Sequence, residues 1–119
     1  MTLTVFHLPT CSTCKKALKW LEANGVKATL IDIREAPPSA EILRSVQERA
    51  EVASQKLFNT SGQVYRGGGW KEQLPELSDG ERFAALASNG MLIKRPLALG
   101  ATQAAVGFKE AEWAEKFGI

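Results

Sequence analysis

Two cysteines separated by two residues are the side chains in this 119-residue chain best suited to perform chemistry. Cys11 and Cys14 lie in segment 9–16, PTCSTCKK, between a strand-like run at residues 3–7 and a helix-like pattern. A thiol at the start of a helix faces the positive end of the helix dipole and unpaired backbone N–H groups, and both favour the thiolate. A second thiol one turn later can resolve the adduct that the first thiol forms. The spacing therefore predicts a redox site in which Cys11 is the nucleophile and Cys14 is the resolving thiol.

Other interpretations of the cysteine pair can be weighed against this one. A structural disulfide is disfavoured, because so small a loop restricts the unfolded chain little. A zinc site needs about four ligands, and His7 is the only additional Cys or His, so neither a metal nor a cofactor is expected. A phosphatase loop has an arginine six residues after its cysteine, where this chain has Ala17. Two inert thiols remain as the open alternative.

The bulk composition narrows the class of protein. Fifteen basic and 13 acidic residues give a net charge of only +2, which is too balanced to predict binding to nucleic acid or to a membrane. The N-terminal residues lack the pattern of a signal peptide, and no apolar run reaches membrane-spanning length. We therefore expect a cytoplasmic protein, and in a reducing compartment a close cysteine pair is typical of catalysis or sensing.

Hydrophobic periodicity predicts a β-α-β unit at the N-terminus. The strand at residues 3–7 is followed by a helix that stops at Asn24 and Gly25, and then by a strand at residues 28–33. A helix of this length between two strands predicts a parallel pair with a right-handed crossover.

A helical segment and a β-β-α unit follow. Two prolines precede a helix capped by Ser39 and running to about residue 55. Residues 66–70, which contain three consecutive glycines, are predicted to be a flexible connection, and Ser78 caps the next helix. Short strands at residues 97–99 and 104–106 form a hairpin, and residues 109–117 form a closing helix.

This order of elements predicts an α/β protein with a thioredoxin-like fold. A helical insert at about residues 37–90 separates the β-α-β half from the β-β-α half, and residues 1–119 form a single domain. Such a fold places a CxxC pair at the start of its first helix.

Two further positions are candidates for the same site. His7 stands four residues before Cys11 at the end of a strand, where it could stabilise the thiolate or simply be satisfied by backbone groups. Thioredoxin-like proteins carry a cis-proline beside the CxxC, and a prolyl bond is far more readily cis than any other. If Pro96 has that role, Arg95 comes near Cys11 and could hold an anion or lower the thiol pKa; the alternative is an ordinary surface arginine.

The residues now described resemble a known family. His7, Cys11, the helix after it, residues 92–96 (LIKRP) and residues 106–108 (VGF) are similar to the arsenate reductase (ArsC)/Spx family over nearly the whole chain. The resemblance implies a thioredoxin-like domain with a helical insert and supports a cis Pro96. It carries the family's catalytic cysteine onto Cys11, its neighbouring histidine onto His7 and one oxyanion-binding arginine onto Arg95.

The chain also departs from that family. Arsenate reductases of this type use one catalytic cysteine and three arginines, whereas Asn59 and Gly107 stand where the other two arginines would be. Losing two charged contacts should weaken oxyanion affinity by several kcal/mol, at roughly 1.5–3 kcal/mol for each. The second cysteine is instead similar to the Spx-type redox-sensing regulators. The CxxC together with residues 58–62 most resembles a small "arsenate reductase-like" branch.

The sequence therefore predicts an oxidoreductase that exchanges disulfides, with arsenate reduction itself left open. Cys11 and Cys14 form a redox-active disulfide, and thioredoxin or glutaredoxin/glutathione restores the thiols. The alternative is an Spx-like redox-sensing transcriptional regulator that binds the α subunit of RNA polymerase.

Overall fold

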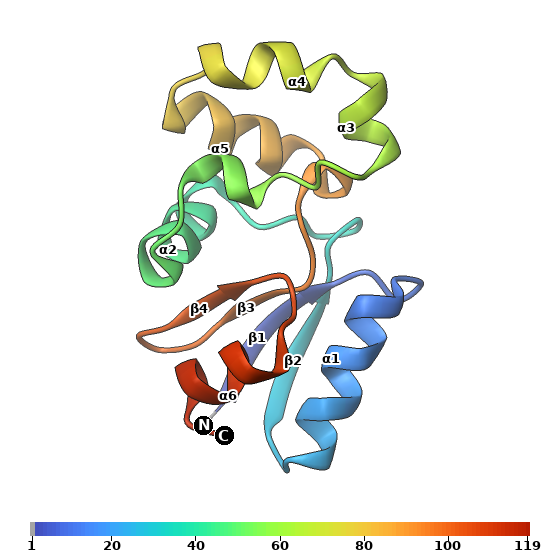
Figure 1. The fold of residues 1–119 in the computed structure, drawn as a ribbon, viewed down its shortest axis with the longest axis vertical. Helices are drawn as coiled ribbons and strands as arrows, with labels where there is room; N and C mark the ends of the chain where they lie inside the picture. Colours follow the sequence, from blue (N-terminus) through green and yellow to red (C-terminus); the bar gives the residue numbers. More distant parts are fainter. Residues whose placement is uncertain (1) are drawn as a thin grey trace.

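A mixed four-stranded sheet organises residues 2–119, which the computed structural model describes (Figure 1). Met1, the first residue of the predicted domain, lies outside the described residues. The strand order is β2-β1-β3-β4. Strand β1 (Thr2–His7) pairs in parallel with β2 (Lys27–Asp32), and β3 (Leu97–Leu99) pairs antiparallel with both β1 and β4 (Ala104–Val106). This confirms the β-α-β and β-β-α halves that the sequence predicts, and the hairpin strands have the predicted bounds.

Two helices cover one face of the sheet. Helix α1 (Ser12–Ala23) connects β1 to β2, and α6 (Glu110–Phe117) follows the hairpin, beginning one residue later than predicted because Lys109 is its N-cap. The sheet and both helices bury one apolar cluster between them: Leu3, Val5, Ala17, Leu21, Ala98, Ala105, Trp113 and Phe117. Alternation along the strands sends their neighbours to the opposite face.

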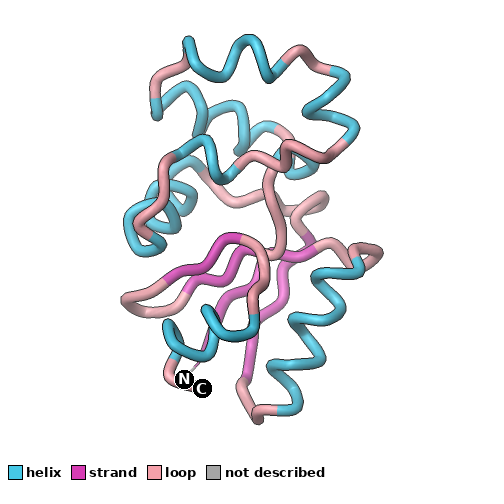
Figure 2. Tube along the Cα trace, viewed as in Figure 1, coloured by secondary structure: helices cyan, strands magenta, loops and turns pink. Residues whose placement is uncertain are grey.

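The helical insert lies on that opposite face, in the upper half of Figures 1 and 2. It consists of α2 (Ala40–Ala50), α3 (Gln63–Gly67), α4 (Trp70–Gln73) and α5 (Asp79–Ser88), with 3-10 turns η1 (Ser54–Leu57), η2 (Leu74–Glu76) and η3 (Gly90–Leu92). Phe6 and Leu97 from the sheet pack into the same buried cluster as Leu43, Phe83 and Leu86 of the insert. The thioredoxin-like α/β fold with a helical insertion is therefore confirmed.

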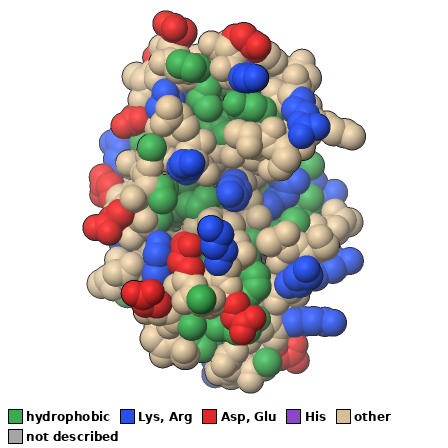
Figure 3. Space-filling model, viewed as in Figure 1, with side chains coloured by type: hydrophobic (Ala, Val, Ile, Leu, Met, Phe, Trp, Pro, Cys, Tyr) green, Lys and Arg blue, Asp and Glu red, His purple; other side chains and the backbone are tan. Residues whose placement is uncertain are grey.

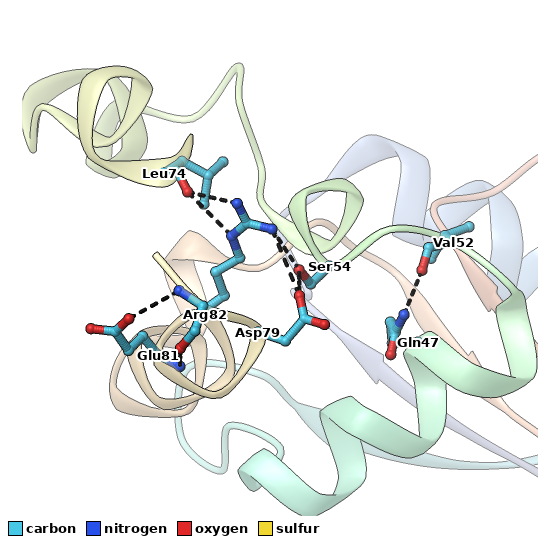
Figure 4. Close-up of polar contacts among 8 residues, drawn as sticks. Gln47, Val52, Ser54, Leu74, Asp79, Glu81 and Arg82 are labelled. Atoms are coloured by element: carbon cyan, nitrogen blue, oxygen red, sulfur yellow. Dashed lines mark hydrogen bonds and ion pairs between the residues drawn. The ribbon is translucent and has the colours of Figure 1, made fainter. Parts of the chain in front are cut away.

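The helix predicted at residues 39–55 is shorter than expected. Ser39 caps α2 as predicted, but the helix ends at Ala50, and Glu51 adopts a left-handed conformation with φ 56°. Gln47 then donates a side-chain hydrogen bond to the Val52 carbonyl at 2.9 Å (Figure 4). No Gly or Asn marks this stop, so the usual sequence signal for a helix end is absent.

The prediction of a flexible connection at residues 66–70 is wrong, because these residues belong largely to α3 and α4. Gly69 has a φ of +70° between the two helices. A Cβ at Gly68 would lie 2.6 Å from the indole nitrogen of Trp70. The glycines therefore allow a tight turn that places the ring centroid of Trp70 5.9 Å from the ring centroid of Phe58.

The bounds of the second strand and the Ser78 cap can also be compared with the sequence predictions. The second strand spans residues 27–32 rather than 28–33: Ile33 still donates its N–H to the His7 carbonyl of β1 at 2.8 Å, but the chain turns there, with the Ala36 N–H donating to the Asp32 carbonyl at 2.9 Å. The predicted Ser78 cap is present as a capping box with Glu81. Within residues 2–119, no helix is both long enough and apolar enough to cross a bilayer.

Candidate active site

Strand β1 and helix α1 place Cys11 at a helix start. The Cys11 N–H donates to the Leu8 carbonyl at 2.9 Å, which closes the turn after β1. The Cys11 carbonyl then accepts from Lys15 N–H at 3.0 Å, so Cys11 is the N-cap residue of α1. Cys11 is half-buried, whereas Cys14 in the first turn is only 1% exposed, and neither is in a disulfide.

The surroundings of Cys11 favour its thiolate. Partial burial acts to raise the pKa of Cys11. The backbone N–H and the thiol of Cys14, the backbone N–H of Thr13 and the charge of Arg95 outweigh that effect, so the pKa is lowered overall. Cys11 therefore combines partial exposure to solvent with a pKa below the ordinary thiol value.

Cys14 shows the opposite behaviour. Burial, opposed by a hydrogen bond from Leu8 N–H to its sulfur at 3.5 Å, raises the pKa of Cys14 to about 11, and interaction with Cys11 adds to the rise. At neutral pH Cys14 is therefore a protonated thiol directly beside Cys11.

The bond between Arg95 and Pro96 is cis, as the sequence analysis expected. Arg95 is half-buried, and its Nη1 donates to the Ile93 carbonyl at 3.2 Å and to the Met91 carbonyl at 3.5 Å. Its Nε is buried without a hydrogen-bond partner among the described residues. The charge of Arg95 lowers the pKa of both cysteines, which brings this side chain into the site.

A pocket of about 340 Å³ opens over Cys11. We call it the Cys11 pocket; its lining comes from four segments far apart in the sequence: Cys11, Thr13, Asn59, Ser61, Lys94, Arg95, Val106, Gly107, Phe108 and Lys109. Asn59, Arg95 and Gly107, where the resemblance predicts the positions of three oxyanion-binding arginines, all line this pocket. The sequence predictions assigned a role at the site to neither Lys94, which lies within the 92–96 motif, nor Lys109, which follows the 106–108 motif.

The Lys94 side chain packs over Gly107. Gly107 has a φ of +77°, and a Cβ there would lie 3.1 Å from the Lys94 Cε. The alkyl chain of Lys94 therefore lies over the glycine, in the space that a side chain at position 107 would need.

His7 does not line the Cys11 pocket. It ends β1 opposite Asp32 in the parallel register, and its Nδ1 is buried without a hydrogen-bond partner in the described chain. The groups that lower the pKa of Cys11 do not include His7. A direct action of His7 on the thiolate thus stays a prediction.

Among residues 2–119, no group of three or more His, Cys, Asp or Glu side chains is placed to hold a metal ion. The chemistry available in the pocket is that of a thiolate, a second thiol and cationic side chains.

Comparison with known proteins decides the family. The ArsC family matches residues 6–116. This chain belongs to the ArsC family. The match contains both cysteines and the whole lining of the Cys11 pocket.

Relatives of this ArsC-family chain carry different descriptions. It is 45% identical over 117 residues to the uncharacterized protein YusI of Bacillus subtilis, covering 98% of this chain and 99% of that one. An arsenate reductase of Neisseria meningitidis is 28% identical over 88% of this chain and 89% of its own length. The global transcriptional regulator Spx of Streptococcus pyogenes is 27% identical over 92% of this chain and 81% of its own length.

The fold also has solved counterparts. An ArsC-family-related protein from Bacteroides fragilis superposes with a TM-score of 0.92 at 38% identity, covering 97% of each chain. Family and fold are therefore shared with both reductases and regulators, and the site itself must guide the choice between them.

Proposed function

We propose that this ArsC-family chain is a thiol–disulfide oxidoreductase in which Cys11 attacks and Cys14 resolves. The observation that carries the proposal is the pair of opposed thiol environments. Cys11 has a lowered pKa and faces a pocket, while Cys14 is buried beside it with a pKa of about 11. A nucleophile and a reserved second thiol are what disulfide exchange requires.

The reaction proceeds in three balanced steps. The Cys11 thiolate attacks one sulfur of a substrate disulfide, forms a mixed disulfide and releases the other sulfur as a thiolate. Cys14 loses its proton to solvent or to that leaving thiolate and attacks the Cys11 sulfur, which releases the second substrate thiolate. A dithiol such as thioredoxin, or glutaredoxin with glutathione, supplies the two electrons that return Cys11 and Cys14 to thiols.

The order of these steps follows from the coupling between the two sulfurs. Burial is the main cause of the raised pKa of Cys14, but the interaction with Cys11 contributes to it. Once Cys11 is bonded to substrate sulfur it no longer carries a thiolate, so that contribution disappears. Cys14 thus becomes easier to deprotonate only after Cys11 has reacted.

Disulfide exchange suits this pocket better than arsenate reduction does. Asn59 and Gly107 stand where the resemblance expects cationic arginines, and Arg95 alone remains of the three. We expect turnover of disulfides to exceed turnover of arsenate.

The test is a set of serine variants. Cys11→Ser should abolish turnover of a disulfide substrate in an assay coupled to thioredoxin or glutaredoxin. Cys14→Ser should accumulate a mixed disulfide on Cys11 that intact-mass spectrometry detects. Ser12→Ala, an exposed change between the two cysteines, is the matched control. Full turnover by Cys11→Ser would show that the mechanism is wrong.

A regulatory role is the second candidate. It is supported by the likeness to Spx over 92% of this chain and by the paired thiols. In this role, formation of the Cys11–Cys14 disulfide changes affinity for the α subunit of RNA polymerase. Pull-down with the C-terminal domain of that subunit, under oxidising and reducing conditions, tests it; no binding in either state excludes it.

A further inference from the structure

A second pocket lies beside the Cys11 pocket and is not explained by the exchange mechanism. It measures about 440 Å³, and we call it the outer pocket; its lining residues are Gln55, Lys56, Phe58, Thr60, Tyr65, Lys71, Leu74, Pro75 and Lys94. Lys94 lines both pockets. Both volumes fall in the range of small-ligand sites, about 300–1,000 Å³.

Residues 58–61 form the partition between the two pockets. Phe58 and Thr60 line the outer pocket, whereas Asn59 and Ser61 line the Cys11 pocket. The partition is held in place because Asn59 N–H donates to the Leu92 carbonyl at 2.8 Å and Phe58 is only 2% exposed. A ligand that enters at Cys11 therefore meets one fixed wall with a basic side chain, Lys94, at its edge.

The charges around both pockets have one sign. Lys56 and Lys71 join Lys94 in the outer pocket, and Lys94, Arg95 and Lys109 line the Cys11 pocket. No Asp or Glu is among the described lining residues of either pocket, although acidic residues number 13 in a chain of net charge +2.

In Figure 3, Lys and Arg side chains follow the right-hand side from the helical insert down to α1, and others lie on the left and in the centre among acidic side chains. The charge of one sign is therefore a feature of the two pocket linings. An anionic ligand is the complement of such a lining.

The outer pocket also has an apolar wall. Phe58 and Tyr65 pack edge to face with centroids 6.4 Å apart, and Leu74 and Pro75 complete the lining. Such walls with a few cationic groups suit a small molecule that has an aliphatic backbone and carboxylates.

We propose that the two pockets form one substrate site for a small acidic disulfide, of the size of a short peptide on each sulfur. This rests on the proposed function. The disulfide lies at Cys11, and an acidic arm passes Lys94 so that its carboxylates reach Lys56 and Lys71. Cys11 bonds to the sulfur that carries this arm, and the other half leaves as a thiolate. Cys14 then displaces the bound arm as the second thiolate, leaving the Cys11–Cys14 disulfide.

A single-turnover experiment tests the charge preference without an added reductant. The fully reduced protein is mixed with excess oxidised glutathione, neutral bis(2-hydroxyethyl) disulfide or cationic cystamine, and quenched samples are analysed by mass spectrometry. Relative to the same reactions of free cysteine, we expect Cys11 to favour oxidised glutathione over the neutral disulfide by about tenfold at low salt, with the preference shrinking as salt rises. Cystamine should be disfavoured.

Lysine variants show which side chains cause the preference of Cys11 for oxidised glutathione. Lys94→Gln should lower the rate with oxidised glutathione several-fold relative to the rate with the neutral disulfide, and the double change Lys56→Gln with Lys71→Gln should lower the same ratio. Lys19→Gln, an exposed lysine on α1 outside both pockets, is the matched control. The neutral disulfide also reports any change in the reactivity of Cys11 itself.

The outcomes separate the inference from the function on which it rests. If none of the three disulfides produces a Cys11–Cys14 disulfide, the proposed exchange function fails. If all three do so with no charge preference and no effect of the lysines, the exchange function stands and the inference is overturned. The small-ligand assignment is also overturned if an acidic protein disulfide reacts much faster than oxidised glutathione with the same lysine dependence.

Discussion

Arg82 in the helical insert and Arg95 in the Cys11 pocket differ in how their guanidinium groups are hydrogen-bonded. In the insert, Arg82 donates from Nε and Nη2 to the Leu74 carbonyl at 3.2 and 2.8 Å, and from Nη1 to the Ser54 hydroxyl at 2.9 Å (Figure 4). Ser54 in turn donates to the Asp79 carboxylate at 2.6 Å. All three guanidinium nitrogens have partners from the chain itself.

Arg95 in the pocket is different. Only Nη1 has hydrogen bonds, both to backbone carbonyls, and Nε is buried without a partner in the described chain. Arg95 also faces a thiol and two lysines rather than a carboxylate in the pocket lining. A buried donor without a partner is costly. Arg82 therefore connects η1, η2 and α5, whereas Arg95 keeps a buried Nε without a partner in the described chain beside the Cys11 pocket.

The largest expected effect is the difference in reactivity between Cys11 and Cys14 at the Cys11 pocket. Alkylation rises with pH as the thiolate forms, so the midpoint for Cys11 should lie below the ordinary thiol value of 9.0 and that for Cys14 near about 11. The two midpoints should therefore lie more than about two pH units apart, which corresponds to more than about 100-fold in thiolate fraction below both midpoints. Iodoacetamide labelling over pH 5–11, mapped by mass spectrometry, measures both. In Cys11→Ser the Cys14 midpoint should fall; equal midpoints in the native chain would contradict the assignment.

Arg82→Leu is expected to have the next largest effect, and on stability alone. It removes the two side-chain donors to the Leu74 carbonyl, which keeps the Leu77 N–H at 3.2 Å, and one partner of the buried Ser54, which should cost about 2 kcal/mol of unfolding free energy. Urea denaturation gives the value, with the exposed Arg66→Leu as control. A large shift in the labelling midpoint of Cys11 in Arg82→Leu would show that the helical insert and the Cys11 pocket are not independent.

Gly107→Ala should have a smaller effect that reaches both stability and the pocket. The positive φ disfavours a side chain by about 1–2 kcal/mol, and the new Cβ would push against Lys94. We expect lower stability in urea denaturation and a weaker preference of Cys11 for oxidised glutathione. Gly25→Ala, also at positive φ but with no neighbour within 4 Å, is the control for backbone strain alone.

Arg95→Gln should have the smallest effect. Unlike Arg82→Leu, it should alter the reactivity of Cys11 rather than stability. Because the charge of Arg95 is the smallest of the effects that lower the pKa of Cys11, the labelling midpoint should rise only slightly. The urea midpoint should change little, since Arg95 makes only two backbone hydrogen bonds. Loss of stability as large as that of Arg82→Leu would show that Arg95 is structural.

Local signals accounted for much of the fold before any tertiary contact was considered. The Ser39 and Ser78 caps, the helix stop at Asn24 and the hairpin strands all depend on neighbours within a few residues. The signals failed at Glu51, where a helix ends without Gly or Asn, and at residues 66–70, where glycines shape a tight turn instead of a flexible connection. Residues beside both places, Ala50 and Val52 at the first and Tyr65 and Trp70 at the second, belong to or pack against the same apolar cluster, and this packing outweighs local preference.

The sequence alone determined the cysteine pair and its place at a helix start, because both are a matter of spacing along one segment, while the thioredoxin-like order of elements and the family resemblance supplied the cis-proline candidate. The tertiary structure decided what surrounds the pair. It brought Asn59, Lys94 and Lys109 to Cys11, left His7 out of the pocket lining and withheld a partner from the Arg95 Nε. These facts depend on segments dozens of residues apart meeting at one edge of the sheet, and no local pattern encodes which side chains face one another there.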